Sequence, residues 1–389
     1  MIPGRPRVVI LDDHITHYRI PLFTYLARQS IQLTVVYCAR NIAPNQPALP
    51  NELAFDHRVL PGFVLRLTRP PYVEPRNVLL NPTLLWELAR LRPDTVVGYS
   101  FSIPTWISFA YARVLGKGFI SWSGDTLHTE RYLGPAQRRV RRIIIPRAQA
   151  CVGLSRAAKE KYLAFGAAAD RVKVSVQASG YSRTGTEQSV RAAPRAGDRQ
   201  SARVLYVGAL SERKGVQYLL ESFANVHRQL PIAQLTIVGD GPLREQLEAR
   251  TAELGLDSAV TFAGFVQPQR LTEYYERAGL FLFPTQEDTF GVVIAEAAAS
   301  GLPLVTSPYA GATSEFVREG ENGFVVEPAD TDAVALAALR VLTDTKLQAR
   351  MSRRSKEIAA SHTLEQAGGQ FLEAIELGLE GGSWAKHAA

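Results

Sequence analysis

Two acidic residues, one before and one inside a predicted helix, are the strongest chemical signal in this sequence. Asp288 precedes the helix, and Glu296 lies within it eight positions later. The apolar run at 280–283 predicts a buried strand that ends just before Asp288. Both acids are therefore expected at the carboxyl edge of a sheet, which is where open α/β sheets bind ligands.

The start of the same helix predicts a phosphate site. The backbone amides near Phe290, Gly291 and Val292 begin the helix, and the unpaired N–H groups and dipole of such an end attract phosphate. A phosphate site beside two carboxylates that can hold hydroxyl groups suits a nucleotide sugar. In the alternative, Asp288 only caps the helix, a common role worth about 1 kcal/mol, and Glu296 is a solvated charge. The apolar residues around Glu296 disfavour solvation, because a carboxylate there needs a partner.

Two basic residues, Arg213 and Lys214, precede another predicted helix, shortly after a strand that turns through Gly208. Positive charges at the start of a helix oppose its dipole. They are better explained if an anion lies between them and the helix amides. The alternative is that both are ordinary surface charges.

These segments resemble the retaining glycosyltransferases of family 4, also called group 1. Residues 283–305 are similar to the paired-acid motif of that family, in which two glutamates separated by seven residues hold the donor, although Asp288 stands where the family has Glu. The Val-Gly and Lys-Gly pairs at 207–208 and 214–215 also match, whereas Ala209 replaces the usual Arg. The resemblance implies the GT-B fold, in which two Rossmann-like, doubly wound α/β domains face a cleft.

The resemblance also implies roles for individual residues. Phe265 follows a strand at a position where relatives let the backbone meet the nucleotide base, although core packing explains it equally well. The predicted donor-binding residues are Gly208, Phe265, Phe290, Gly291, Val292 and Glu296. The predicted catalytic residues are Arg213, Lys214, Asp288 and His128.

The first half of the chain is expected to bind the acceptor. Asp13, His14 and Arg19 follow the first predicted strand, and residues 18–23 resemble a branch of the family that acts on lipid-linked or surface-polysaccharide sugars. Asp125 and His128 follow the strand predicted at 118–122, where some relatives place a histidine that touches the transferred sugar. We therefore predict acceptor contacts for Asp13, His14, Arg19 and Asp125, and the alternative for His128 is a structural or solvated histidine.

The domain organisation follows from the alternation of strand and helix patterns, which predicts parallel sheets covered on both faces. We predict an N-terminal acceptor domain at 1–181, a linker at 182–201 and a C-terminal donor domain at 202–365. The linker is rich in Arg, Gly, Ser, Thr and Ala and lacks apolar periodicity. Residues 366–389 are expected to form a last helix and tail that returns to the first domain.

The composition argues against several other classes of protein. Among 389 residues, 46% are hydrophobic and 21% charged, and only two cysteines are present, so neither a disulfide framework nor a zinc site is predicted. No apolar run reaches membrane-spanning length, and the expected compartment is the cytoplasm. The net charge of +7 includes a basic stretch that could face anionic lipid or only water. Its candidate membrane contacts are Arg138, Arg139, Arg141 and Arg142.

The sequence therefore predicts an enzyme that moves a hexosyl group from a UDP- or GDP-sugar to a glycan or lipid-linked acceptor with retention of configuration. The resemblance implies a front-face route, and the lack of a suitably placed Asp-x-Asp pair agrees with chemistry that needs no metal or other cofactor. A nucleic-acid role is disfavoured, because no aromatic platform accompanies the basic residues. The alternatives are a non-catalytic nucleotide-sugar-binding partner subunit and, less favoured, a nucleotide-sugar epimerase or a phosphorylase of the same architecture.

Overall fold

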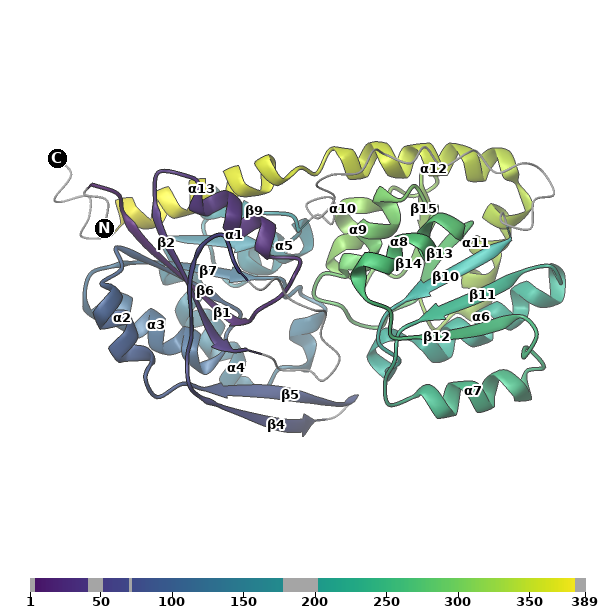
Figure 1. The fold of residues 1–389 in the computed structure, drawn as a ribbon, viewed down its shortest axis with the longest axis horizontal. Coiled ribbons are helices and arrows are strands. Elements are labelled where there is room, and N and C mark those ends of the chain that lie inside the picture. The colour runs from purple at the N-terminus through teal and green to yellow at the C-terminus, as the bar shows by residue number, and fades with distance from the viewer. Residues whose placement is uncertain (1–3, 41–51, 70–71, 178–201, 382–389) are drawn as a thin grey trace. The chain divides into compact units, whose positions relative to one another are not determined.

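The computed structural model describes residues 4–40, 52–69, 72–177 and 202–381, which form two compact units. The first unit comprises 1–177 together with 363–389, and the second comprises 178–362. Each unit is built on a parallel sheet with helices packed against it (Figure 1). The predicted class of two doubly wound α/β domains is therefore confirmed. The segment predicted as a linker, 182–201, lies outside the described residues.

The sheet of the first unit has seven strands in the order β3-β2-β1-β6-β7-β8-β9. β1 pairs in parallel with β2 on one side and with β6 on the other. The strand order therefore reverses between β1 and β6, and loops on the two sides of this point lead to opposite faces of the sheet. The strands are β1 (Arg7–His14), β2 (Gln32–Ala39), β3 (Asp56–Val59), β6 (Thr95–Tyr99), β7 (Gly118–Ser123), β8 (Ala150–Gly153) and β9 (Val172–Val174).

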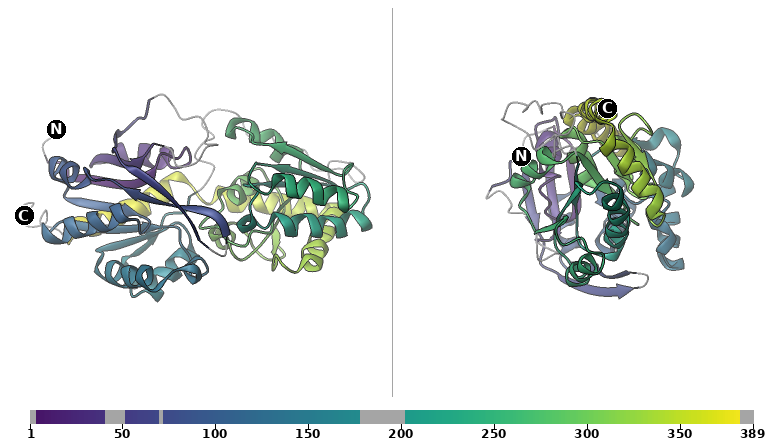
Figure 2. Two further views of the ribbon diagram at one scale, coloured as in Figure 1. Left: turned by 90° about the horizontal axis from the view of Figure 1, so that it is seen from below. Right: turned by 90° about the vertical axis from the view of Figure 1, so that its right-hand side faces the viewer.

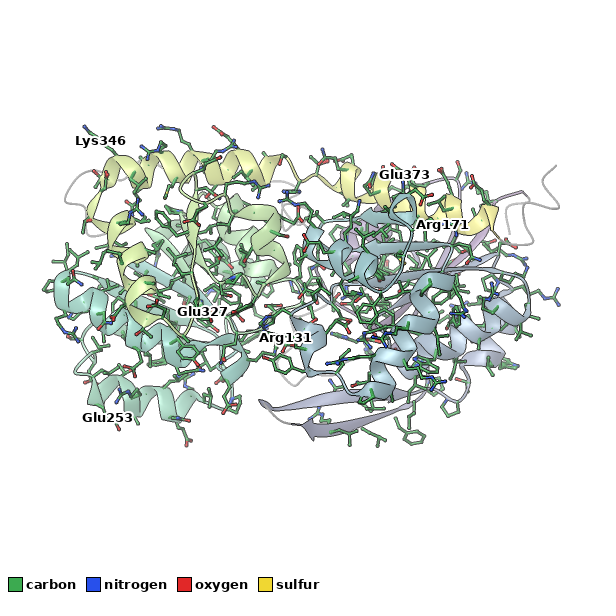
Figure 3. The ribbon with its side chains drawn as sticks, turned by 180° about the vertical axis from the view of Figure 1, so that it is seen from behind. Arg131, Arg171, Glu253, Glu327, Lys346 and Glu373 are labelled. Carbon is green, nitrogen blue, oxygen red and sulfur yellow. The ribbon has the colours of Figure 1, made fainter. Side chains whose placement is uncertain are left out.

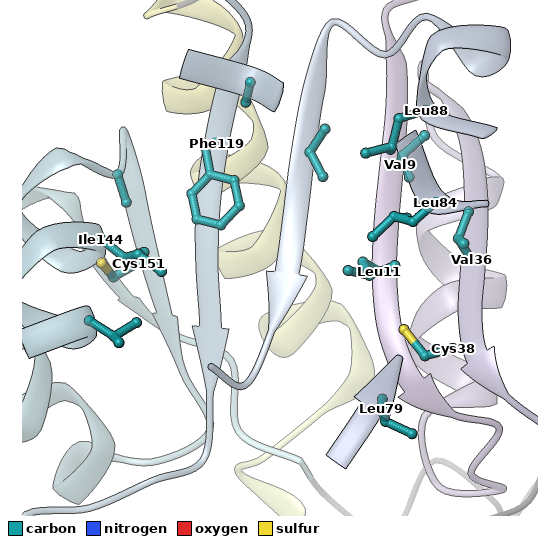
Figure 4. Packing of buried hydrophobic residues seen from close by; sticks show 14 of the residues in the cluster. Val9, Leu11, Val36, Cys38, Leu79, Leu84, Leu88, Phe119, Ile144 and Cys151 are labelled. Atoms are coloured by element: carbon teal, nitrogen blue, oxygen red, sulfur yellow. The ribbon is translucent and has the colours of Figure 1, made fainter. Parts of the chain in front are cut away.

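Helices cover both faces of this sheet and bury its apolar side chains. The core includes Val9, Leu11 and Phe119, all at most 2% exposed (Figure 4). Cys38 and Cys151 are buried, unbridged members of the same core. The helices are α1 (Ile20–Ala27), α2 (Leu84–Leu91), α3 (Ile103–Val114), α4 (Pro135–Ile144) and α5 (Arg156–Ala164), with short 3-10 turns η1 (Thr129–Tyr132), η2 (Ile145–Arg147) and η3 (Ala169–Arg171).

An antiparallel hairpin that the sequence did not predict interrupts the first unit between β3 and α2. Its strands, β4 (Phe63–Arg69) and β5 (Tyr72–Leu80), form a sheet of their own. In the right-hand view of Figure 2 the hairpin lies along the bottom edge, apart from the seven-stranded sheet. Phe63, Leu65 and Leu67 alternate along β4 and are all exposed, so the hairpin carries an apolar ridge that faces solvent.

The second unit repeats the same principle with six strands in the order β12-β11-β10-β13-β14-β15. β10 pairs in parallel with β11 and with β13, so this sheet reverses its order between β10 and β13. The strands are β10 (Arg203–Val207), β11 (Gln234–Val238), β12 (Val260–Gly264), β13 (Leu280–Phe283), β14 (Leu304–Thr306) and β15 (Gly323–Val325).

The helices of the second unit follow the predicted rhythm up to α9. The pattern did not predict the short α10 or the long pair α11 and α12, and α12 packs against α9. The helices are η5 (Glu212–Lys214), α6 (Val216–Gln229), α7 (Arg244–Glu253), α8 (Pro268–Arg277), α9 (Val292–Ala299), α10 (Gly311–Phe316), α11 (Thr331–Thr343) and α12 (Thr345–Ala360).

The last helix, α13 (Leu364–Glu380), belongs to the first unit although the second unit precedes it in the chain. Its inner face packs on β7, β8 and β9, and the fully buried Phe371 ring lies edge-on to Trp122 at 5.3 Å. Glu373, which Figure 3 labels, lies on the outer face of the helix, and its carboxylate pairs with Lys173 at 2.7 Å. The helix covers one face of the seven-stranded sheet, and its apolar stripe binds it there.

We predict that Phe371→Ala destabilises the first unit by about 3–5 kcal/mol, because it removes a fully buried ring and leaves a cavity. Glu373→Ala on the outer face of the same helix is the matched control and is expected to cost less than about 1 kcal/mol. Urea unfolding followed by tryptophan fluorescence measures both, since Trp122 lies against Phe371. Equal losses for the two variants would contradict the packing assigned to α13.

Candidate active site

The predicted donor residues gather where the strand order of the second unit reverses. Gly208 follows β10, and Asp288 follows the adjacent strand β13 after a short loop. Because parallel strands end at the same edge, the loops after β10 and β13 meet there, and this is the position at which open α/β sheets bind ligands. The topology therefore brings together residues about eighty positions apart in the sequence.

Lys214 and Asp288 form an ion pair at this point. The Lys214 Nζ lies 2.5 Å from Asp288 Oδ2, and the two side chains are only 12% and 15% exposed. The other carboxylate oxygen, Asp288 Oδ1, accepts a hydrogen bond of 3.2 Å from the Phe290 amide. Asp288 thus supports the turn before α9, as the capping interpretation predicted, and also binds a cation.

Backbone hydrogen bonds fix the two loops to each other. The carbonyl of Arg213 accepts bonds from the amides of Gln286 and Glu287, and the Arg213 guanidinium donates to the Glu287 carbonyl at 3.0 Å. Gly215 permits this contact, because a Cβ at that position would lie 1.9 Å from the Pro284 carbonyl oxygen. The two basic residues are therefore held on a rigid support and not on a free loop.

The charges around Asp288 keep it ionised. Burial by itself would raise the pKa of this carboxyl. The charges of Lys214 and Arg213, with hydrogen bonds from Lys214 and the Phe290 amide, outweigh burial and hold the pKa below its ordinary value. At neutral pH Asp288 is therefore a carboxylate, and the Lys214 and Arg213 side chains are the cations that hold it in this form.

The N-terminus of α9 lies beside this pair. Gly291 is its N-cap residue and has a φ of +84°, a conformation that favours glycine. Val292 begins the helix, and Phe290 is 4% exposed. The predicted phosphate-binding start of the helix is thus adjacent to the two basic side chains.

Glu296 lies on α9, as predicted, and has a partner that the sequence did not reveal. The hydroxyl of Tyr275, on α8, donates a hydrogen bond of 2.7 Å to Glu296 Oε2. Tyr275 is 3% exposed, whereas Glu296 is half-buried. Burial raises the pKa of Glu296 to about 7, although the hydrogen bond from Tyr275 favours the ionised form.

Ala209 leaves its position open. The residue is exposed, and the nearby Tyr206 hydroxyl donates a hydrogen bond of 3.1 Å to its carbonyl. The Tyr206 ring stacks on the Phe283 ring with 5.8 Å between the ring centres, and this contact fixes its position. Phe265, just beyond β12 at the same edge, is 41% exposed, which disfavours the core-packing alternative for this residue.

Arg19, in the first unit, does not occupy the exposed position that was predicted for acceptor binding. It is 4% exposed and forms a buried ion pair with Asp12, which is 1% exposed. Its guanidinium also lies 3.7 Å from the centre of the Tyr99 ring. Because both charges are buried and paired, Arg19 supports the end of β1 and is closed to direct contact with a ligand in this structure.

Asp13 and His14 are half-buried at the carboxyl end of β1, next to the reversal between β1 and β6. Ser100, just after β6, has a φ of +59° and donates a hydrogen bond of 3.2 Å to Asp13 Oδ2. Burial and the neighbouring Asp12 raise the pKa of Asp13 to about 7. Burial and the charge of Arg19 lower the pKa of His14 to about 4, so His14 is neutral and Asp13 can gain or lose a proton near neutral pH.

Asp125 and His128 lie in the loop that follows β7. Arg141 holds the loop from α4, with its Nε 2.6 Å from Glu130 and its Nη2 3.4 Å from Asp125. His128 is half-buried and contacts Arg131. This histidine belongs to the first unit, whereas the other three predicted catalytic residues belong to the second.

The basic stretch on α4 divides into two kinds of residue. Arg138, Arg139 and Arg142 are exposed, but Arg141 is buried and paired with acids. Its assignment as a candidate membrane contact is therefore wrong, because its guanidinium faces the interior. Among the described residues, no helix is both long and apolar enough to cross a bilayer.

Three contributors to the candidate sites were missed in the sequence. Tyr275 holds Glu296, Ser100 holds Asp13, and the Tyr206 hydroxyl binds the Ala209 carbonyl. None carries a local motif, and the bonds of Tyr275 and Ser100 join residues that are far apart in the chain. For Tyr275, the alternation of apolar and polar residues on α8 predicts a buried side chain, but it does not specify the hydrogen-bond partner.

We predict that Glu296→Gln stabilises the protein at pH 8 by on the order of 2 kcal/mol, with little effect near pH 4.5. The reason is that the folded pKa of about 7 exceeds the ordinary value of 4.5. The stability due to the protonated form is complete below pH 4.5 and is lost as the pH rises through 7. Thermal unfolding across pH measures this, with the exposed Glu248→Gln as control. A difference in stability between Glu296→Gln and the parent protein that does not change with pH would contradict the assigned pKa.

Comparison with known proteins agrees with this geometry. Residues 193–358 match the family model described as glycosyl transferases group 1. The alpha-D-kanosaminyltransferase of Streptomyces kanamyceticus is 34% identical over 178 residues, which cover 45% of this chain and 46% of that protein. The sulfoquinovosyl transferase SQD2 of Arabidopsis thaliana is 26% identical over 302 residues, covering 74% and 58%. The chain thus spans about half the length of the curated relatives it matches.

A solved structure extends the similarity in fold to nearly the whole chain. The Anabaena protein HepE, solved in complex with UDP, superimposes with a TM-score of 0.72 at 18% identity, over 96% of this chain and 99% of that one. At this identity the likeness concerns the fold alone. Residues 193–358 are thus similar to the glycosyl transferases of group 1, and the two parallel-sheet units of the chain have the GT-B fold.

Proposed function

We propose that the chain is a retaining glycosyltransferase that moves a hexosyl group from a UDP- or GDP-sugar to a glycan or lipid-linked acceptor. The observation that carries the proposal is the ion pair of Lys214 with Asp288, fixed beside Arg213 and the start of α9. The group 1 match of residues 193–358 supports transfer of a sugar. HepE, which shares the fold, has also been solved with UDP and glucose and with UDP-glucose, which supports a nucleotide-sugar donor.

The proposed chemistry depends on stabilising a leaving diphosphate. Arg213 and Lys214 bind its oxygens together with the amides at Gly291 and Val292. As the bond from the anomeric carbon to the phosphate oxygen breaks, negative charge grows on that oxygen, and preorganised donors of this kind stabilise it. Lys214 is then shared between the phosphate and Asp288, which also holds hydroxyl groups of the sugar.

The other predicted donor residues position the nucleotide. Glu296 holds the ribose hydroxyls, with its carboxylate oriented by Tyr275. Gly208 leaves the edge of β10 open to the phosphates, and Phe265 lies beside the base. Because its pKa is about 7, Glu296 accepts hydrogen bonds best above neutral pH.

The first unit binds the acceptor. Its hydroxyl oxygen attacks the anomeric carbon from the face that the diphosphate leaves, and its proton passes to the departing phosphate oxygen, so the configuration is retained. Asp13, His14 and Asp125 bind acceptor hydroxyls, and His128 contacts the transferred sugar. Since Arg213 and Lys214 supply the positive charge, we propose that transfer needs no metal ion or other cofactor, and that the reaction takes place in the cytoplasm.

A second candidate function is a nucleotide-sugar-binding subunit without turnover. Two departures from the family favour it, the shorter acid at Asp288 and the missing guanidinium at Ala209. Such a protein would bind the donor and transfer nothing. A measurement of sugar transfer therefore distinguishes the binding subunit from the enzyme.

We predict that the purified chain releases UDP or GDP from one member of a donor panel when lipid-linked or glycan acceptors are present. Lys214→Ala is expected to lower kcat/KM by about 10²–10³ through loss of charge stabilisation. Glu296→Ala is expected to raise KM, because its contact is with the nucleotide. Rates are measured by nucleotide release, with and without a chelator. Donor binding without release from any member of the panel would contradict the enzyme and favour the binding subunit.

Ala209→Arg is the matched gain-of-contact control. The position is exposed at the edge of β10, so an added guanidinium can reach a bound diphosphate and is expected to tighten UDP binding about tenfold, the effect of one charge-assisted hydrogen bond. Calorimetry measures this affinity without requiring turnover. Unchanged or weaker UDP binding would place the diphosphate away from this strand end.

We also propose that the first unit contacts an anionic membrane surface from the inner face of the cell membrane. Arg138, Arg139 and Arg142 are exposed on α4, next to the half-exposed Ile143, and basic side chains near such a surface contribute about 1 kcal/mol each. The exposed apolar ridge of β4 belongs to the same unit. A lipid-linked acceptor would be reached from this surface.

Replacing Arg138, Arg139 and Arg142 with alanine is predicted to lower binding to vesicles that contain phosphatidylglycerol, by about a hundredfold or more at low salt. Lys346, Arg350 and Arg353, exposed on α12, provide the control triple replacement, which leaves binding unchanged. Vesicle sedimentation measures both. Equal binding of the α4 variant and the parent protein would exclude this surface.

A further inference from the structure

One face of the second sheet has an unusual character at the end opposite the donor residues. Strands of a parallel sheet covered on both faces are apolar throughout, but β11 and β12 alternate. Leu235 and Ile237 are buried, whereas Gln234 and Thr261 are exposed and Thr236 is half-buried. The polar residues therefore share one face, and that face is incompletely covered.

Strand register brings these side chains side by side. Thr236 lies opposite Thr261 on β12, and Arg203 lies opposite Gln234. In parallel pairs, residues in register project to the same face. β10 contributes Leu205, which lies opposite Thr236 and forms the apolar base of this surface.

α8 encloses the polar face from one side. Right-handed crossovers place α6 and α8 on opposite faces of the sheet, so α8 is the helix that approaches here. Its residues Tyr274 and Arg277 line a cavity of about 430 Å³ together with Arg203, Gln234, Thr236 and Thr261. This volume lies within the range of small-molecule sites, about 300–1,000 Å³.

The cavity carries positive charge without compensation. Within the described parts of the chain, neither Arg203 nor Arg277 has an acidic partner, and no acid lines the cavity. Arg250 of the same unit, by comparison, lies 2.7 Å from Glu221. Two guanidinium groups that line one cavity, from β10 and α8, favour a ligand with an anionic group, because guanidinium binds carboxylate and phosphate with two parallel hydrogen bonds.

The remaining lining groups indicate the rest of the ligand. Gln234, Thr236 and Thr261 offer an amide and two hydroxyls, which suit a molecule with several hydroxyl groups. The Tyr274 side chain adds an amphipathic surface of the kind that binds such rings. Arg203 begins β10 and Gly208 follows its end, so the cavity lies roughly 15 Å from the predicted diphosphate position.

We propose that this cavity is a second binding site, separate from the donor site, for a small hydroxylated organic anion such as a sugar phosphate or a sugar acid. The anionic group lies between Arg203 and Arg277, and the hydroxyl groups bind Gln234, Thr236 and Thr261. The site is complete within the second unit and does not depend on the proposed transferase activity.

Calorimetric titration of the full chain with glucose 6-phosphate, glucuronate and glucose tests the site at low ionic strength. One molecule of at least one anion is expected to bind, and neutral glucose is expected not to. The double variant Arg203→Ala/Arg277→Ala should weaken binding at least tenfold, and Arg203→Lys/Arg277→Lys should restore part of it. Comparison of the phosphate with the carboxylate identifies the anionic group that the site prefers.

Two controls separate this site from the donor site and from general charge effects. Lys214→Ala removes a cation of the donor site and should leave anion binding unchanged, as should Arg228→Ala/Arg353→Ala on α6 and α12. UDP titrated into the same variants reports on the donor site independently. Absence of binding by both anions at millimolar concentration, or equal binding by the parent and the Arg203→Ala/Arg277→Ala variant, would overturn the proposal.

Discussion

The contact between the loops after β10 and β13 is the constraint on which the candidate donor site depends. Lys214 is paired with Asp288, and the Arg213 carbonyl accepts amides from the opposite loop. Without this contact, two cations would stand at the start of a helix whose dipole repels them. The Asp288 carboxylate compensates Lys214 and places this ion pair beside the amides of α9. A diphosphate would complete this balance, because it can replace the solvent around both cations.

The two carboxylates of the motif have opposite electrostatic environments. Asp288 has a lowered pKa because two cations surround it, whereas burial raises that of Glu296 to about 7. This difference suits two tasks. An ionised Asp288 keeps Lys214 in place, while Glu296 is held by the Tyr275 hydroxyl, which ribose hydroxyls would replace in the proposed function. Retaining a half-buried carboxylate of this kind reduces stability at high pH, which is common where binding requires it.

The first unit repeats the arrangement with different residues. Its sheet also reverses order between two adjacent strands, β1 and β6, and the loops there meet through Ser100 and Asp13. A buried pair of Asp12 with Arg19 lies directly beneath. Arg19, which the sequence assigned to acceptor binding, is used in this ion pair. The charge of Asp12, together with burial, raises the pKa of Asp13. With a pKa of about 7, Asp13 can therefore gain or lose a proton near neutral pH.

The sequence by itself determined the alternation of strands and helices, the two sheets and the acids at 288 and 296, because these depend on local periodicity and on residues close together in the chain. The tertiary structure decided which distant residues meet. Tyr275 reaches Glu296, Arg19 turns inward to Asp12, and α13 packs on the first unit after the whole second unit has been completed. Such pairings depend on strand order and on the face that each helix covers, and neither is encoded in a local pattern. The polar cavity beside α8 arises in the same way, since only the register of β10, β11 and β12 places its arginines, threonines and glutamine on one face.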